Sequence, residues 1–381
     1  MYKNKYFQIL KTRFLEKNPL IQVLLGPRQV GKTTIAEALF NSWDGPKIMV
    51  SADNPSPPTS EWVRFHWEQA RLKGEGTLLI IDEVQKIPGW SEQIKSLVDE
   101  DRRGVKIKAL LLGSSALYLQ KGLKESLAGR FELIEVPHWT LGDFEKTFGW
   151  DFDKYIRFGA YPGAASFAED EERWRNYILH SIVEPVIGKD ILGSHPVSKP
   201  ALFRQTFELA THYPAQVVSF QKLLGQLQDF GNTTTIKDYL NLMEQSFLLL
   251  CLQKYSGSYL QTKSASPKII ISNPALIHAY TSQSHLRANP QWYGFVFESL
   301  VGYHLSRIPN SQLYYWRDRN LEVDFILQTP KNLWAIEVKS GSKAKTGKGL
   351  TAFLKEYPKA ICEVWDYAKS VEFMRSGVLG E

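Results

Sequence analysis

The first third of the chain alternates short apolar runs with segments of helical period. Runs over residues 21–25, 77–81 and 106–116 are dominated by apolar side chains, and glycine or acidic residues follow their apolar cores. Short apolar runs bounded by turn residues are typical of strands buried on both faces. Strands that alternate with helices predict an α/β domain built on a parallel sheet.

The segment GPRQVGKTT follows the first run directly and leads into the helical pattern IAEALF. This is the G-x-x-x-x-G-K-T pattern of a P-loop between a strand and a helix, and it predicts ATP binding. Glycines let the backbone turn tightly around phosphate, while Lys32 brings positive charge to the β- and γ-phosphates. The Thr33 hydroxyl is a ligand for Mg²⁺. The predicted ATP-binding residues here are Gly26, Pro27, Arg28, Gln29, Val30, Gly31, Lys32, Thr33 and Thr34.

The second run ends in two adjacent acidic residues, Asp82 and Glu83. We expect its strand to lie beside the P-loop strand, so that Asp82 holds Mg²⁺ through its water shell. Glu83 is then placed to polarise the attacking water as general base. The pair favours an ATP hydrolase over a kinase, which must exclude water.

These motifs, together with LLLGSSA and ESLAGRFELIEVPHWTLGDF, resemble a widespread family of prokaryotic AAA+-like ATPases with a poorly characterised C-terminal domain. The resemblance implies that Ser114 senses the γ-phosphate, although a plain turn would also explain it. It implies that Arg130, in the motif S-L-A-G-R, is an arginine finger for a neighbouring subunit's nucleotide. A surface arginine paired with an acid is the alternative. A homo-oligomer such as a hexameric ring follows from this resemblance. The segment FGAYPGAA departs from the family pattern at Ala160 and Gly163.

The strand–helix alternation stops near residue 151. Residues 173–192 have helical period, and the resemblance makes them a lid over the nucleotide. Two helical stretches, 217–230 and 233–250, and a strand-like run at 249–255 follow in the order of a winged helix. Ile236, Leu240, Met243 and Phe247 form one apolar stripe of the second helix, opposite Lys237 and Asn241. The polar face could enter a DNA groove, or the unit could be a scaffold.

Near the end of the chain, a helical segment at 291–308 precedes strands at 312–318, 321–327 and 333–341. Side chains alternate across a strand, so Val323, Phe325 and Leu327 should share one face, opposite Glu322 and Asp324. Pairing of the last two strands through the turn QTPKN would bring Asp324 beside Glu337, with Lys339 on the same face as Glu337.

The pattern D…E-x-K after a helix with Glu298 resembles the PD-(D/E)xK nuclease superfamily, with Val323 in place of the proline. The resemblance implies a Mg²⁺ site formed by Glu298, Asp324 and Glu337, with Lys339 as the catalytic lysine. Two alternatives stay open, a solvated alternating strand and a nuclease fold kept for DNA binding or assembly without cutting. Lys343, Lys345 and Lys348 could grip a phosphate backbone, or could simply be solvated.

Composition is that of a globular protein, with 43% hydrophobic and 23% charged residues in 381. Only Cys251 and Cys362 are present, and no run resembles a signal peptide or membrane span, which together favour a cytoplasmic protein. The net charge of +6 permits a polyanionic partner.

The sequence thus predicts an α/β protein of three domains. These are an AAA+-like P-loop ATPase domain (1–150), a helical lid with a winged-helix-like unit (151–285) and an α/β restriction-endonuclease-like domain (286–381). The predicted activity is ATP hydrolysis, with ATP and Mg²⁺ as cofactors, coupled to translocation or remodelling of duplex or branched DNA that the last domain cuts or recognises. An ATP-dependent switch or scaffold for a protein partner, with an inert C-terminal domain, is the alternative.

Overall fold

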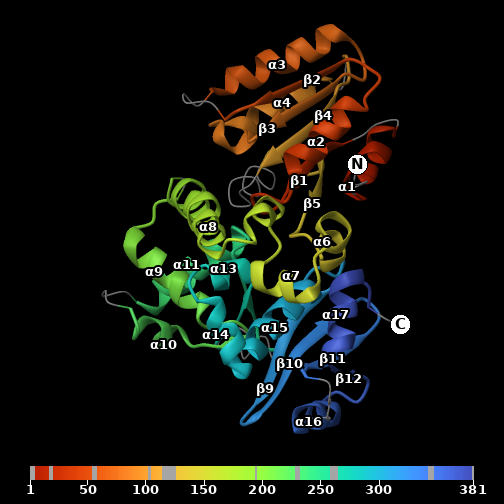
Figure 1. The fold of residues 1–381 in the computed structure, drawn as a ribbon. Coiled ribbons are helices and arrows are strands. Elements are labelled where there is room, and N and C mark those ends of the chain that lie inside the picture. The colour runs from red at the N-terminus through yellow and green to blue at the C-terminus, as the bar shows by residue number, and fades with distance from the viewer. Residues whose placement is uncertain are drawn as a thin grey trace. The chain divides into compact units, whose positions relative to one another are not determined.

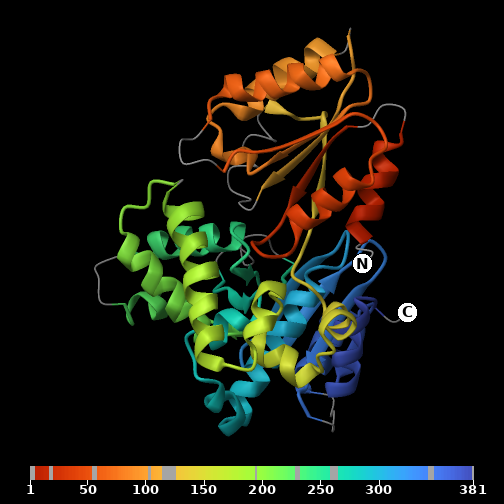
Figure 2. The ribbon, with the colours of Figure 1, turned by 45° about the horizontal axis from the view of Figure 1, so that its top comes forward.

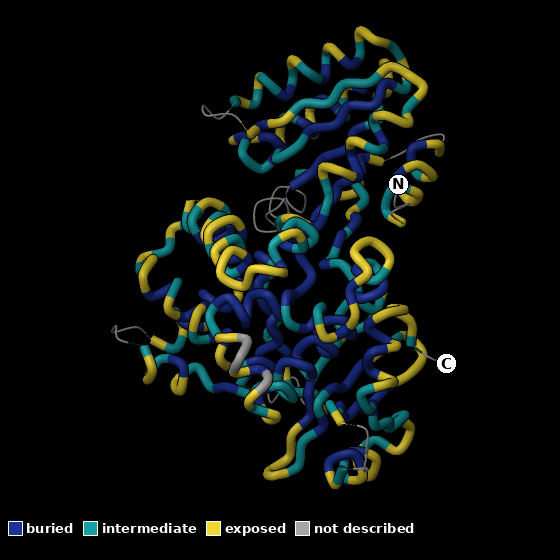
Figure 3. The backbone as a smooth tube through the Cα atoms, viewed as in Figure 1, coloured by how far each residue is buried: buried dark blue, intermediate teal, exposed yellow. Residues whose placement is uncertain are grey.

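A computed structural model describes residues 5–16, 20–53, 58–101, 104–113, 126–193, 195–227, 232–257, 265–341 and 347–379. The chain forms two compact units, Met1–Pro137 and His138–Glu381, which are described separately. Figures 1 and 2 show the elements of each in two views, and Figure 3 shows that the central strands of both units are buried.

The N-terminal unit is built on a parallel sheet whose described strands follow the order β2-β3-β4-β1-β5. Helices α1 and α2 cover one face, where Leu10, Ile35 and Leu39 pack on Leu24 and Leu110. Helices α3 and α4 lie on the other face (Figure 1). The bounds are α1 (Lys5–Phe14), β1 (Ile21–Leu25), α2 (Lys32–Asn41), β2 (Lys47–Ser51), α3 (Ser60–Lys73), β3 (Leu78–Asp82), α4 (Trp90–Asp101), β4 (Lys108–Gly113) and β5 (Phe131–Glu135). The predicted α/β class with a parallel sheet is confirmed.

The order of the strands corrects one expectation. Strand β3, which ends at Asp82, does not lie beside the P-loop strand β1, because β4 pairs with both. The order of strands depends on how the connections between them cross the sheet, and this cannot be read from the apolar runs. The third predicted strand begins two residues later than expected, since β4 starts at Lys108, and residues 114–116 of the prediction lie outside the described residues.

The C-terminal unit begins with helical segments. Residues 173–192 are helical as predicted, although α8 (Glu171–Tyr177) continues in the wider π-helical turns Ile178–Val183 and Pro185–Leu192. Proline has no N–H to donate, so the ladder of helical hydrogen bonds is interrupted at Pro185. The other helices of this part are α6 (Leu141–Phe148), α7 (Phe152–Phe158) and α9 (Pro200–Thr211), with a short 3₁₀ turn at Pro162–Phe167.

A small antiparallel sheet follows, with the strand order β6-β8-β7. The elements run β6 (Gln216–Val217), α10 (Phe220–Leu224), α11 (Thr233–Gln245), β7 (Leu249–Leu252) and β8 (Lys268–Ile271). Helix α11 buries Ile236, Leu240 and Met243, while Lys237 and Asn241 are exposed, as the stripe predicted. Phe247 lies beyond the end of the helix with a positive φ of 61°, so its place in the stripe was wrong.

The last part pairs β9 (Gln312–Asp318), β10 (Leu321–Gln328), β11 (Leu333–Val338) and β12 (Ile361–Trp365) in one sheet. Strands β9, β10 and β11 are antiparallel, and β12 runs parallel to β11 after the crossover helix α16 (Lys348–Glu356). Helix α15 (Pro290–Leu305) precedes this sheet and α17 (Tyr367–Ser376) ends it, with α13 (Pro274–His278) and α14 (Gln283–Ala288) before α15.

Strand β10 departs from simple alternation. Its pairing with β9 shifts register between Val323 and Ile326, which marks a bulge. Val323 and Ile326 therefore share the face that packs on α16 with Phe353. The ring of Phe325 instead lies against Gly302 of α15, where a Cβ would come within 2.6 Å of it. The expectation that Val323 and Phe325 face the same side was wrong, because one extra residue breaks the two-residue period.

Candidate functional site

The P-loop connects β1 to α2 and is held tightly at its first residue. A Cβ on Gly26 would lie 2.1 Å from the carbonyl oxygen of Val136, so only glycine fits there. Gly31 has a φ of 91°, a left-handed conformation that glycine adopts without strain. The Lys32 ammonium donates to the carbonyls of Gly26 at 2.9 Å and Pro27 at 2.7 Å. The Lys32 side chain thus folds back onto the P-loop, the segment that the motif predicts to bind phosphate.

The predicted acidic pair meets the P-loop at the carboxyl edge of the sheet. The Thr33 hydroxyl donates to Asp82 Oδ2 at 3.0 Å, and the Glu83 backbone N–H donates to Asp82 Oδ1 at 2.9 Å. Glu83 has a φ of 54°, a strained conformation for a residue with a Cβ. Its carboxylate accepts a hydrogen bond from the Gln85 side chain. Strain of this kind is often retained where a side chain must point at a reacting group.

These residues fit a nucleotide with Mg²⁺. A hydroxyl and a carboxylate within hydrogen-bond distance of each other are oxygen ligands of the type that Mg²⁺ prefers. Lys32 supplies positive charge within the P-loop, and Glu83 directly follows Asp82 in the sequence. Ser114, the predicted γ-phosphate sensor, lies outside the described residues.

Arg130 lies at the opposite edge of the same sheet. It immediately precedes β5, and Phe131 pairs with Ile21 at the start of β1, whereas the P-loop follows the end of β1. A strand of five residues spans about 16 Å, which separates Arg130 from the P-loop of its own chain. Its guanidinium donates to both carboxylate oxygens of Asp99, at 3.0 and 3.1 Å from Nη2.

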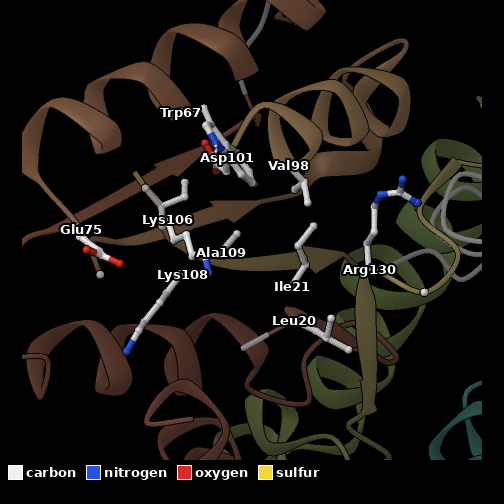
Figure 4. Close-up of a pocket in the computed structure, with 13 residues that line it drawn as sticks. Leu20, Ile21, Trp67, Glu75, Val98, Asp101, Lys106, Lys108, Ala109 and Arg130 are labelled. Carbon is white, nitrogen blue, oxygen red and sulfur yellow. Dashed lines mark hydrogen bonds between the residues drawn. The ribbon is translucent and has the colours of Figure 1, made fainter. Parts of the chain in front are cut away.

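A cavity of about 370 Å³ opens at this edge, and Figure 4 shows Arg130 on its wall with Ile21 and Lys108. The geometry excludes Arg130 from the nucleotide of its own chain.

The D…E-x-K residues of the C-terminal unit come together as the hairpin predicted. Phe325 pairs with Ile336, which puts Asp324 opposite Glu337. Asp324 Oδ2 accepts from the Val338 N–H at 2.7 Å, and Lys339 pairs with Glu337 Oε1 at 2.7 Å. Burial opposes the charge of Lys339, but the Glu337 hydrogen bond and the nearby carboxylates raise its pKa. Glu337 Oε2 is buried and accepts from no donor among the described residues.

Sequence reasoning missed the central residue of this cluster, Lys268 at the start of β8. Its ammonium lies 2.5 Å from Glu298 Oε1, 3.3 Å from Glu322 Oε1 and 3.8 Å from Asp324 Oδ1. Burial opposes the positive charge, yet the surrounding carboxylates raise the pKa of Lys268 overall. Burial, with the charge of Asp324 next, raises the pKa of Glu298. The available signal was a lysine at the head of the apolar run KIII.

The cluster does not fit the predicted metal. Two of the three expected ligands, Glu298 and Asp324, face the Lys268 ammonium. Across the described ranges, no group of three or more His, Cys, Asp or Glu side chains is arranged to hold a metal ion. A second cavity of about 510 Å³ borders the chain just beyond Lys339, lined by Arg157, Ser340 and Gly341 among others.

The comparisons with known proteins agree with the first site. Residues 18–145 match a family described as "AAA domain". These residues are similar to AAA-type P-loop domains. This similarity supports ATPase activity. Residues 149–287 and 293–377 match two families described as domains of unknown function, DUF8612 and DUF4143.

Relatives and solved structures extend the likeness beyond the P-loop domain. Uncharacterized proteins of Mycobacterium tuberculosis and Mycobacterium bovis are each 28% identical over 352 residues, covering 90% of this chain and 75% of the relative. A Walker-type ATPase of Pyrococcus abyssi has a similar structure, with a TM-score of 0.52 and 14% identity over 74% of this chain and 96% of its own. At that identity the likeness concerns the fold. In the part of the chain that the structure describes, no helix has the length and apolarity to cross a membrane.

Proposed function

We propose that this chain hydrolyses ATP and uses the energy to translocate along or remodel duplex or branched DNA. The observation that carries the ATPase part is the meeting of Thr33 and Asp82 at 3.0 Å, beside Lys32 and Glu83. On nucleotide binding, the Lys32 ammonium would exchange the two P-loop carbonyls for phosphate oxygens. Thr33 and Asp82 would hold Mg²⁺, which supplies charge neutralisation at the phosphates. Glu83 would accept a proton from the attacking water.

Arg130 supports assembly of several copies. Because Arg130 lies at the sheet edge away from its own P-loop, it could serve as an arginine finger only for a nucleotide held by another copy. We therefore propose a homo-oligomer, such as a hexameric ring, in which each copy lends Arg130 to its neighbour. To reach the neighbour's nucleotide, the Arg130 guanidinium would have to break its hydrogen bonds with Asp99.

The DNA part of the proposal rests on two stretches of the C-terminal unit. The order of α9, β6, α10, α11, β7 and β8 agrees with a winged helix, and α11 exposes Lys237 and Asn241. Helix α15 followed by β9, β10 and β11 agrees with the nuclease-like order. We assign 1–150 to the ATPase, 151–285 to the lid and winged-helix-like part and 286–381 to a restriction-endonuclease-like domain.

A second candidate is an ATP-dependent switch or scaffold for a protein partner, with an inert C-terminal domain. The observation in its favour is Lys268, whose ammonium lies among the carboxylates that a metal nuclease would need. In this case nucleotide turnover at Glu83 would time assembly with the partner.

The test begins with ATP turnover and nucleotide binding by the full chain. Lys32→Ala should abolish nucleotide binding. Glu83→Gln should keep binding and lose about 10²–10⁴-fold in turnover, the usual contribution of a general base. Glu75→Gln is the matched control, because Glu75 lies at the opposite edge of the same sheet. Brisk hydrolysis by the Glu83 variant would rule out the assigned base.

The DNA part is tested separately with single-stranded, duplex and four-way-junction DNA. We expect at least one form to bind and to change the rate of ATP turnover. If none of the three binds or alters turnover in an active ATPase, the DNA proposal fails and the protein-partner candidate takes its place.

A further inference from the structure

We propose that the ammonium of Lys268 is the resident cation of the C-terminal acidic cluster, so that the D…E-x-K site holds no catalytic divalent metal. The cluster then acts as an ionic tie between β8 and the sheet that carries Asp324. This inference concerns the C-terminal unit alone and does not depend on ATP hydrolysis at Lys32.

Four oxygens lie within 4 Å of the ammonium. A lysine has three N–H donors. The closest oxygens are Glu298 Oε1 at 2.5 Å, the Asp324 carbonyl at 3.2 Å and Glu322 Oε1 at 3.3 Å. Asp324 Oδ1 adds charge at 3.8 Å. A bound Mg²⁺ needs oxygens at about 2.0–2.1 Å in octahedral geometry, and the ammonium occupies the position where Glu298 and Asp324 would converge on it.

The lysine is also fixed in place. Lys268 is buried, and its ammonium lies 5.1 Å from the centre of the Phe325 ring. Its backbone pairs with Leu252 on one side and Val217 on the other. The next residues of β8 are buried as well. The Lys268 side chain is therefore held in a packed, buried environment, unlike a lysine on the surface.

The other predicted groups have protein partners of their own. Asp324 Oδ2 takes the Val338 N–H, and Glu337 Oε1 takes Lys339. Among the described residues, Glu337 Oε2 has no donor, and Glu298 Oε1 makes no regular hydrogen bond although the Lys268 ammonium lies 2.5 Å from it. Two oxygens, one of them against the ammonium, do not make a site for a hard divalent ion. The three carboxylates around Lys268 come from α15 and β10, so the tie joins β8 to both elements.

The test measures Mn²⁺ binding by the electron paramagnetic resonance signal of free Mn²⁺, without nucleotide. The full chain carries Asp82→Asn to remove the P-loop ligand, and its companion carries Asp324→Asn in addition. We expect the two proteins to bind the same amount of Mn²⁺. Loss of one bound Mn²⁺ per chain on Asp324→Asn would overturn the proposal. Both proteins keep Lys268, so this comparison does not require the lysine variant to fold.

A second pair of variants asks whether Lys268 itself excludes the ion. In the same Asp82→Asn background, Lys268→Met should gain about one Mn²⁺ per chain, and adding Asp324→Asn should remove it. Lys339→Met is the matched control and should gain none, because Lys268 stays in place. A folded Lys268→Met protein that gains no Asp324-dependent Mn²⁺ would overturn the proposed exclusion. ATP turnover is not read in either experiment, so failure here is distinct from failure of the proposed ATPase.

Discussion

Replacing Lys268 with methionine should destabilise the C-terminal unit strongly. The substitution keeps an unbranched side chain one atom shorter than lysine but removes a buried positive charge. It leaves Glu298 and Asp324, whose side chains are 15% and 17% exposed, without their counter-charge. Breaking a buried ion pair on one side costs about 3–5 kcal/mol. For a unit of this size each kcal/mol lowers Tm by about 2–4 °C, so a fall of roughly 6–20 °C is expected.

The matched control is Lys339→Met, which also removes a lysine from a carboxylate of this cluster. The Lys339 side chain is 42% exposed, against 1% for Lys268, so its pair with Glu337 should contribute only about 0–1 kcal/mol. Thermal and urea unfolding, monitored by circular dichroism, gives the free energy of unfolding of the Lys268→Met and Lys339→Met variants. Adding Glu298→Gln to Lys268→Met should recover part of the loss, since one stranded carboxylate is then neutral.

Acid should also reduce the penalty of Lys268→Met. Burial and the charge of Asp324 already raise the pKa of Glu298, so this carboxyl takes up a proton readily as the pH falls and no longer needs a cation. A raised pKa of an acid favours the folded state at low pH and loses that contribution as the pH rises. If Lys268→Met were as stable as Lys339→Met at neutral pH, the ionic tie would be refuted.

Three further predictions follow from single contacts. Gly26→Ala should abolish nucleotide binding in a binding titration, because its Cβ would lie 2.1 Å from the Val136 carbonyl oxygen; normal affinity would show that the loop can move away. Arg130→Ala should lower ATP turnover by about 10³-fold or more, and mixing it with Glu83→Gln should restore activity at mixed interfaces; no recovery would exclude action between copies. Burial lowers the pKa of His278 to about 4, below its ordinary 6.5, so this residue costs stability as the pH falls through that window. His278→Gln should reduce the loss of unfolding free energy between pH 7 and pH 5 by an amount on the order of 1–3 kcal/mol, measured by urea unfolding at both pH values, and an unchanged loss would contradict the assignment.

Much of the P-loop site could be predicted from sequence because its parts are local. Gly26, Lys32 and Thr33 lie within one strand–turn–helix segment, whose geometry follows from glycine conformation and hydrophobic period. The pairing of Asp324 with Glu337 was predictable for the same reason, since a short turn joins their strands and side chains alternate along each. Local sequence therefore determined which residues meet within a single turn or hairpin.

Only the tertiary structure decided which distant segments meet. The order of parallel strands placed β4 between β1 and β3 and put Arg130 at the edge away from the P-loop. A bulge of one residue in β10 turned Phe325 to the face opposite Val323. Lys268 reached the acidic cluster from a strand far upstream, and it pairs there with three carboxylates. Such contacts depend on how the chain crosses and packs over long separations, and neither periodicity nor motif spacing encodes that path.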